Sequence, residues 1–186
     1  SVKNIPIFTV HQSYEDMGAL LFDADQDGDH DLIVISGSYE FEEGSEQLKN
    51  RLYFNDGKGN FTYDNNALPE MKTNGSCVAA GDYDQDGDLD LFIGGRVVSG
   101  KYPMAPESFL LENINGRFEN ISESIAEFSK MGMVTSALWT DYDDDDDLDL
   151  ICVGEWMPIC VFTNTGGSFK KSTIPNSTGW WNSISG

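Results

Sequence analysis

The chain is poor in the residues on which nucleic-acid-binding proteins and many enzymes rely. It has 11 Lys and Arg residues against 32 Asp and Glu, which gives a formal net charge of −21. Phosphate binding draws on Lys and Arg, so we expect no nucleic-acid partner. The two histidines, His11 and His30, lie in no recognisable triad, and Walker, His-Glu-x-x-His and Gly-x-Ser-x-Gly motifs are missing. The sequence therefore predicts a protein that is not an enzyme.

Long apolar runs are also missing. No stretch approaches the ~20 consecutive apolar residues of a membrane helix, so we expect no membrane span. Cys77, Cys152 and Cys160 are the only cysteines. Their apolar surroundings favour small buried side chains, and a second interpretation pairs Cys152 with Cys160 across a hairpin. Hydrophobic residues make up 39% of the chain, which argues for a folded core despite the charge.

What the sequence does contain is one acidic loop repeated three times. Loop 1 (residues 23–31), loop 2 (82–90) and loop 3 (141–149) begin 59 residues apart, at Asp23, Asp82 and Asp141. They hold five, five and seven of the acidic residues in turn. A lone acidic run is usually a solvated surface. Recurrence at a fixed period instead indicates a repeated structural unit.

Each loop lies between short apolar runs that are typical of buried strands. In the first unit these runs are residues 18–22 and 32–35. A third run follows at 51–54, then a turn rich in Asn and Gly, then a fourth run that opens with Phe61. The other two units repeat this order, with turns that begin at Asn113 and Asn164 and fourth runs that open with Phe118 and Phe169. We expect these turns to need positive φ, which Asn and Gly tolerate.

Four antiparallel strands per unit indicate a blade of a β-propeller. The predicted fold class is all-β: a partial β-propeller of about three four-stranded antiparallel blades, with fragments of the flanking blades. Residues 1–186 form one propeller segment in this prediction, and a propeller needs about four to eight blades to close. We therefore expect a piece of a longer chain whose open blade edges favour self-association. The predicted parts are blade 1 at about 17–64, blade 2 at about 75–121, blade 3 at about 133–172, and neighbouring blades at 1–16 and 179–186.

The loops have the chemistry of a calcium site. Carboxylates at loop positions 1, 3, 5 and 9 can converge on one point, and position 7 can add its backbone carbonyl. Hard oxygen ligands in this number suit Ca²⁺, which takes about six to eight of them. We expect up to three structural Ca²⁺ ions. The candidate ligand residues are Asp23, Asp25, Asp27, Asp29, Asp31, Asp82, Asp84, Asp86, Asp88, Asp90, Asp141, Asp143, Asp145, Asp147 and Asp149.

The same residues allow two alternatives to a calcium site of this kind. An EF-hand needs a bidentate Glu at position 12, where these loops have Val34, Ile93 and Cys152. A metal-free acidic turn would leave four or five carboxylates repelling one another. Loop 3 carries Asp146 at position 6, where the other two loops have Gly, and Asp enters the left-handed region at a cost. Loop 3 is therefore the site that we expect to be weakest.

These residues resemble a known family. The loop pattern is similar to that of FG-GAP/VCBS repeat proteins and of integrin α-subunit propellers. A closer resemblance is to bacterial proteins of the ASPIC/UnbV type, which are related to cartilage acidic protein. The resemblance implies a calcium-stabilised propeller that is secreted, on the cell surface or in the bacterial cell envelope. The matching segments are residues 80–84, 94–98, 132–135, 154–159 and 179–182.

Blade topology also predicts where a ligand binds. If strands run alternately up and down, the acidic loops lie on one face, here called the metal face. The connections 38–50, 96–107 and 155–158 then lie on the opposite face, here called the connection face. Aromatic residues there can stack on a sugar or anchor a protein, or they can fill gaps between blades. The candidate ligand residues are Arg96, Lys101, Tyr102, Glu155 and Trp156.

The function that the sequence favours is a calcium-binding extracellular propeller fragment that serves protein or glycan recognition or adhesion. The alternative is the propeller portion of a carbohydrate-active enzyme, a lyase or hydrolase, with its site on the connection face. A purely structural spacer is a third interpretation.

Overall fold

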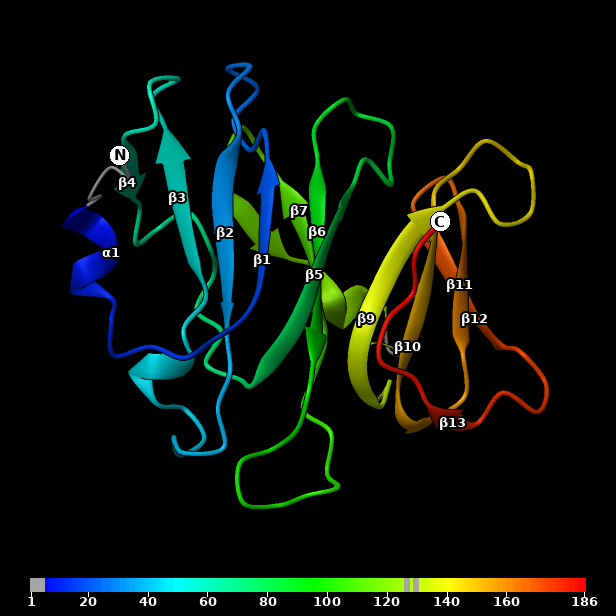
Figure 1. Cartoon of the computed structure of the whole chain (residues 1–186). Coiled ribbons are helices and arrows are strands. Elements are labelled where there is room, and N and C mark those ends of the chain that lie inside the picture. Colours follow the sequence, from blue (N-terminus) through cyan, green and yellow to red (C-terminus); the bar gives the residue numbers. More distant parts are fainter. Residues whose placement is uncertain (1–5, 126–127, 129–130) are drawn as a thin grey trace.

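Three antiparallel sheets dominate the computed structural model, which describes residues 6–125, 128 and 131–186 (Figure 1). Two sheets have four strands, and the third has the same four plus one short strand from the residues that follow. The four consecutive strands of each sheet are one blade, and the predicted all-β fold with four-stranded blades is confirmed. Blade 1 contains β1 (Asp16–Phe22), β2 (Asp31–Ser36), β3 (Arg51–Asn55) and β4 (Phe61–Tyr63). Blade 2 contains β5 (Gly75–Gly81), β6 (Asp90–Gly95), β7 (Phe109–Asn113) and β8 (Phe118–Asn120). Blade 3 contains β9 (Met133–Thr140), β10 (Asp149–Met157), β11 (Cys160–Thr165) and β12 (Ser168–Thr173).

The innermost strands of successive blades lie side by side. Strand β5 contacts both β1 and β9, and the Ser76 hydroxyl of β5 donates to the Val134 carbonyl of β9 at 2.6 Å. The Thr135 hydroxyl, one repeat later, donates to the Trp181 carbonyl at 2.7 Å. Residues 179–186 therefore run beside β9 much as β9 runs beside β5 (Figure 1). Their first two residues form β13 (Gly179–Trp180), which pairs with the end of β10.

The N-terminal segment covers blade 1. The sequence assigns residues 1–16 to a preceding blade. In the structure, β1 already includes Asp16, and helix α1 (Pro6–Val10) lies against β4. The ring of Phe8 packs edge-on against Tyr53, and His11 Nδ1 lies 2.8 Å from the Tyr53 hydroxyl. These aromatic contacts hold the segment on the outer strands of blade 1. Residues 1–5 lie outside the described part of the chain.

The hydrophobic cores lie between blades. Leu91 and Ile93 of β6 belong to a cluster shared with blade 1, whereas Phe92 belongs to a second cluster shared with blade 3. Strand β7 alternates in the same way, with Leu110 in the second cluster. Both faces of blade 2 are thus buried, which explains why its strands read as continuous apolar runs rather than as an alternating pattern.

The three cysteines are free. Cys152 and Cys160 face each other in register across β10 and β11, and both are buried. Burial raises the pKa of each thiol, and that of Cys152 is raised well above its ordinary value. Cys152 and Cys160 are therefore small buried side chains, the first of the two interpretations that the sequence allows, whereas Cys77 is half-buried.

The two ends of the blades carry different connections. The acidic loops join the first and second strand of each blade and lie along the upper rim of Figure 1. The connections from β2 to β3 and from β6 to β7 lie along the lower rim and include a short 3₁₀ turn, η1 (Glu46–Leu48). A second 3₁₀ turn, η2 (Ser122–Ser124), follows β8. Among the described residues, no helix has the length and apolar character needed to cross a membrane.

Leu110 offers a test of the core between blades 2 and 3. It is fully buried, so Leu110→Ala should remove about 2–5 kcal/mol of unfolding free energy through lost burial and a residual cavity. Leu21→Ala is the matched control, because Leu21 is 57% exposed and its truncation should change stability by less than about 0.5 kcal/mol. Urea denaturation measures both. Equal losses in the two variants would contradict this placement of the core.

Candidate metal centres and ligand face

The three acidic loops close through the same hydrogen bond. The carboxylate at position 1 accepts from the backbone N–H at position 6, over 3.1 Å from Gly28 to Asp23 and 3.2 Å from Gly87 to Asp82. In loop 3 the donor is the backbone N–H of Asp146, again at 3.1 Å. Each loop thereby folds back on itself and brings carboxylates together. The groups with ligand oxygens within 4.8 Å of one another are Asp23, Asp25 and Asp27; Asp82, Asp84 and Asp86; and Asp141, Asp143 and Asp149.

Loops 1 and 2 contain oxygens that lack a hydrogen-bond donor. Oδ1 of Asp23 and Oδ1 of Asp82 are both buried and unpartnered, although the other oxygen of each carboxylate accepts the loop-closing bond. A buried carboxylate oxygen without a donor is costly unless a cation meets it. The donor set is all oxygen, which is the kind that Ca²⁺ prefers. The residues of these two loops therefore fit a calcium ion.

Loop 3 differs at the same atom. Oδ1 of Asp141 accepts a hydrogen bond from the backbone N–H of Asp145 at 3.1 Å, so it is not left unpartnered. Asp146 adopts the left-handed conformation with φ of 71°, where loops 1 and 2 have Gly28 and Gly87 at φ of 89° and 99°. Loop 3 thus combines backbone strain at position 6 with a first carboxylate that is already occupied, which supports the expectation of a weaker site.

Burial and neighbouring carboxylates oppose the ionisation of the loop Asp side chains. Burial, followed by the neighbouring Asp27, raises the pKa of Asp25, and burial followed by Asp86 does the same for Asp84. In loop 2, burial raises the pKa of Asp88 to about 6 and that of Asp90 to about 7. Without a cation, the loops therefore hold their negative charge unfavourably.

The carboxylates at position 9 are buried and bonded to the backbone. In each loop, Oδ1 of this carboxylate accepts a hydrogen bond from the backbone N–H of the Asn at the end of the third strand, at 2.7–2.8 Å. The pairs are Asp31 with Asn55, Asp90 with Asn113, and Asp149 with Asn164. The second oxygen of each carboxylate accepts the N–H of position 2. In loops 1 and 2 these residues stand outside the close group of three carboxylates, whereas in loop 3 Asp149 belongs to it. Position 9 therefore ties each loop to the third strand of its blade.

The side chains at position 7 face the turn between the third and fourth strands. Asp147 accepts from the backbone N–H of Gly166 at 2.9 Å, and the Asp88 carboxylate receives a backbone hydrogen bond from Asn115. In loop 1, Asp29 lies so close to Gly57 that a Cβ there would meet its Oδ2 at 2.2 Å. Oδ1 of Asp88 is nevertheless buried and unpartnered like Oδ1 of Asp82, so the side chain at position 7 stays a candidate ligand in loop 2.

Sequence reasoning missed the role of three asparagines. The positive φ expected in the turns falls on residues such as Gly57, Asn115 and Gly167, and not on the leading Asn. The side-chain amide of Asn164 instead donates to two carbonyls. One is that of Leu148 in loop 3 of the same blade, at 3.2 Å, and the other is that of Tyr83 in loop 2, at 2.6 Å. Asn113 repeats this one unit earlier, with Leu89 and Ala24 as acceptors. Asn55 donates within its own blade, to His30. The recurrence of Asn at this place in every unit was the available signal.

The connection face gathers four of its five candidate residues. Arg96 forms an ion pair with Glu155, which is buried, so the pair joins blades 2 and 3. The indole N–H of Trp156 donates to the Tyr102 hydroxyl at 2.6 Å, and the ring of Trp156 packs edge-on against Trp180 at 5.3 Å. Trp156 has φ of 55° and is 62% exposed. The structure thus presents an exposed aromatic cluster next to a held ion pair.

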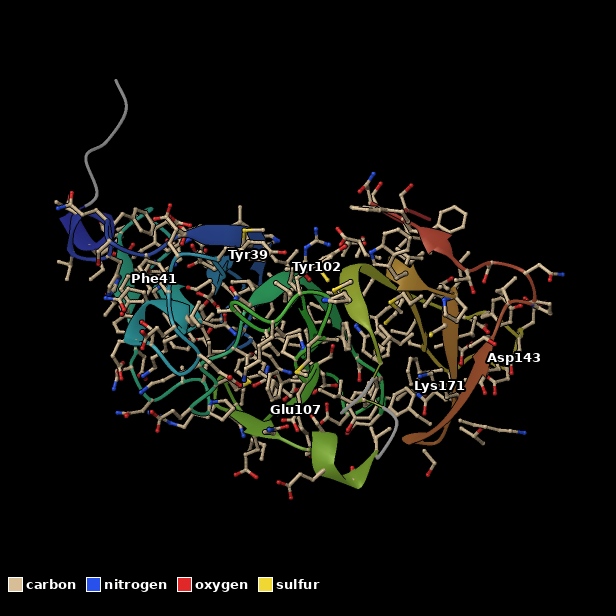
Figure 2. The ribbon with its side chains drawn as sticks, turned by 90° about the horizontal axis from the view of Figure 1, so that it is seen from below. Tyr39, Phe41, Tyr102, Glu107, Asp143 and Lys171 are labelled. Atoms are coloured by element: carbon tan, nitrogen blue, oxygen red, sulfur yellow. The ribbon has the colours of Figure 1, made fainter. Side chains whose placement is uncertain are left out.

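Lys101, the fifth candidate, directly precedes Tyr102 in the chain and pairs with a residue of blade 1's connection. It pairs with Glu43 at 3.0 Å and borders an open hollow of about 420 Å³ together with Tyr39 and Phe41. Figure 2 views the molecule from below and labels Tyr39, Phe41 and Tyr102. Tyr39 was not among the sequence candidates, although it is 60% exposed and lies in the connection 38–50.

Asn164 provides a test of the interblade hydrogen bonds. Asn164→Ala should cost at least about 2 kcal/mol of unfolding free energy, because each buried polar group left unpaired costs about 1–3 kcal/mol. Asn55→Ala is the matched control, since the hydrogen bonds of Asn55 to described residues stay within blade 1, and it should cost clearly less. Chemical denaturation of both variants decides the point. An equal loss would show that the bond to the preceding loop contributes nothing.

Comparison with known proteins agrees with the repeat seen in the structure. The family model described as FG-GAP-like repeat matches residues 23–93, which contain loops 1 and 2 and the strands between them. A search of curated proteins finds no match. Over residues 23–93 the chain is therefore similar to FG-GAP-like repeats, the broader of the two families that the sequence resembles.

Proposed function

We propose that this chain is a calcium-stabilised propeller segment that recognises a protein or glycan ligand. The observation that carries the calcium part is the pair of buried, unpartnered oxygens, Asp23 Oδ1 and Asp82 Oδ1, at equivalent places in two loops. Crowded carboxylates around each of them supply further oxygen ligands. The same unpartnered oxygen occurs in two separate loops, which supports a cation of the same kind in each loop rather than a local irregularity in one of them.

Calcium would supply positive charge that relieves the repulsion among the loop carboxylates. The side chains at positions 1, 3 and 5 would hold it, and position 9 would keep the loop fastened to the third strand of the blade. Extracellular calcium modules have Kd values of about 10⁻⁴–10⁻³ M. At ten times such a Kd, each site would add about 1.4 kcal/mol of stability. The proposed location, secreted or at the cell surface or bacterial envelope, rests on the resemblance to ASPIC/UnbV proteins.

Ligand recognition is assigned to the connection face. Trp156, Tyr102 and Trp180 offer exposed aromatic surface, and the hydrogen bond between Trp156 and Tyr102 fixes the orientation of the indole. Rigid aromatic rings are effective anchors for sugars and for protein side chains. We propose binding rather than catalysis, because Glu155 is already engaged by Arg96. Among FG-GAP-like proteins, the segments around Arg96, Trp156 and Trp180 favour the ASPIC/UnbV type.

Thermal melts with Ca²⁺ and with a chelator test the metal sites. Calcium should raise the melting temperature of the wild-type chain because it binds the folded loops and not the unfolded chain. Asp25→Ala and Asp84→Ala should each remove part of this gain, and Asp143→Ala should remove less because loop 3 is the weaker site. Glu40→Ala, an exposed acidic residue outside the loops, is the charge control. A melting temperature that does not respond to chelation would refute the calcium proposal.

Binding to a glycan array and to immobilised extracellular proteins tests the ligand face. A ligand found in either screen should lose at least about tenfold in affinity for Trp156→Ala, because a central aromatic anchor commonly contributes about 2 kcal/mol or more. Tyr142→Ala serves as the control, since Tyr142 is an exposed aromatic in a loop of the metal face. Blank screens with a protein that still melts cooperatively would instead support a structural spacer.

A further inference from the structure

A glutamine side chain connects each acidic loop to the next. Gln26, at position 4 of loop 1, donates from its side-chain amide to the carbonyl of Gly87 in loop 2 at 2.9 Å. Gln85, at position 4 of loop 2, donates to the carbonyl of Asp146 in loop 3 at 3.0 Å and to Oδ1 of Asp147 at 2.8 Å. The same contact is thus made twice, one repeat apart, between exposed groups of neighbouring loops.

Both ends of this contact lie next to candidate calcium ligands. Gln26 stands between Asp25 and Asp27, and its backbone is in the left-handed conformation with φ of 62°, as is that of Gln85 with φ of 61°. The peptide that accepts the bond joins Gly87 to Asp88, and it is also held from its other side, because the Asp88 N–H donates to Oδ1 of Asp86 at 3.1 Å. A short path therefore runs from the ligands of loop 1, through Gln26 and the peptide between Gly87 and Asp88, to the candidate ligand at position 5 of loop 2.

A second set of bonds crosses the same boundary in the opposite direction. The Asn113 amide of blade 2 donates to the carbonyl of Ala24 in loop 1 at 2.9 Å, and Asn164 of blade 3 donates to Tyr83 in loop 2. Each boundary between loops is thus bridged from both sides. In loop 3, position 4 is Asp144, whose ionised side chain can only accept, so the donor series runs from loop 1 to loop 3.

We infer that Gln26 and Gln85 couple neighbouring calcium sites, so that filling one loop strengthens binding at the next. This inference rests on the calcium binding proposed above. An ion that fixes Asp25 and Asp27 also fixes Gln26 between them, and Gln26 then holds the Gly87 peptide in the position that loop 2 needs. Coupling of this kind is reciprocal, so loop 2 strengthens loop 1 by the same factor. One exposed hydrogen bond supports a factor of roughly two to ten in affinity.

Calcium titrations followed by NMR at the backbone amides of Gly28 and Gly87 test the coupling loop by loop. Asp84→Ala disables loop 2, and its effect on the loop 1 midpoint is measured in the wild-type chain and in Gln26→Met. Met has nearly the length of Gln, is neutral, and lacks the donor, so the comparison cancels the effect of charge on loop 1. We expect the effect of Asp84→Ala on the loop 1 midpoint to differ between the two backgrounds by roughly two- to tenfold.

The outcomes separate the coupling from the calcium proposal. Gln26 is exposed, so Gln26→Met should fold, and Gln12→Met repeats the substitution at an exposed site outside the loops, where it should leave the loop 1 midpoint unchanged. If Asp84→Ala has the same effect in both backgrounds while calcium still binds, the loops are independent and the coupling is refuted. If neither glycine amide responds to Ca²⁺ in the wild-type chain, the calcium proposal itself is wrong.

Discussion

Repulsion between carboxylates is the constraint on which the rest of this structure depends. Five to seven acidic residues stand within nine positions of each hairpin loop, and no loop supplies its own counter-charge. Backbone N–H groups donate hydrogen bonds to the carboxylates at positions 1 and 9, and side-chain amides donate to carbonyls of the loops. In loops 1 and 2, Asp23 Oδ1 and Asp82 Oδ1 remain unpartnered after these bonds are made. A divalent cation would meet that remaining need, which is the reason for proposing that the loops are metal sites.

The same loops make the blades depend on one another. Apolar clusters lie between blades rather than within them, so each sheet is completed by its neighbour. At the metal face, Gln26, Gln85, Asn113 and Asn164 add hydrogen bonds across the same boundaries. Non-directional burial brings the sheets together, and directional bonds fix their register at the rim. These hydrogen bonds are the physical basis of the coupling proposed between adjacent loops.

The periodic features of the chain were predictable, and the contacts between repeats were not. The 59-residue period and the short apolar runs identified the four strands of each blade, because strand pairing within a hairpin is local in sequence. The loop pattern also identified the candidate metal residues. Gln26 and Asn164 were missed because their partners lie 61 and 81 residues away, and spacing alone does not show which carbonyl an amide will reach. Residues 1–16 were assigned to a preceding blade because nothing in their sequence shows that Phe8 packs against the ring of Tyr53.

The most direct measurement is the electron density of crystals grown with calcium. The account predicts an ion in loop 1 and another in loop 2, each about 2.3–2.6 Å from carboxylate oxygens that include Asp23 Oδ1 and Asp82 Oδ1, with lower occupancy in loop 3. Loops 1 and 2 that hold only water under these conditions, with Asp23 Oδ1 and Asp82 Oδ1 bonded to protein donors, would contradict it.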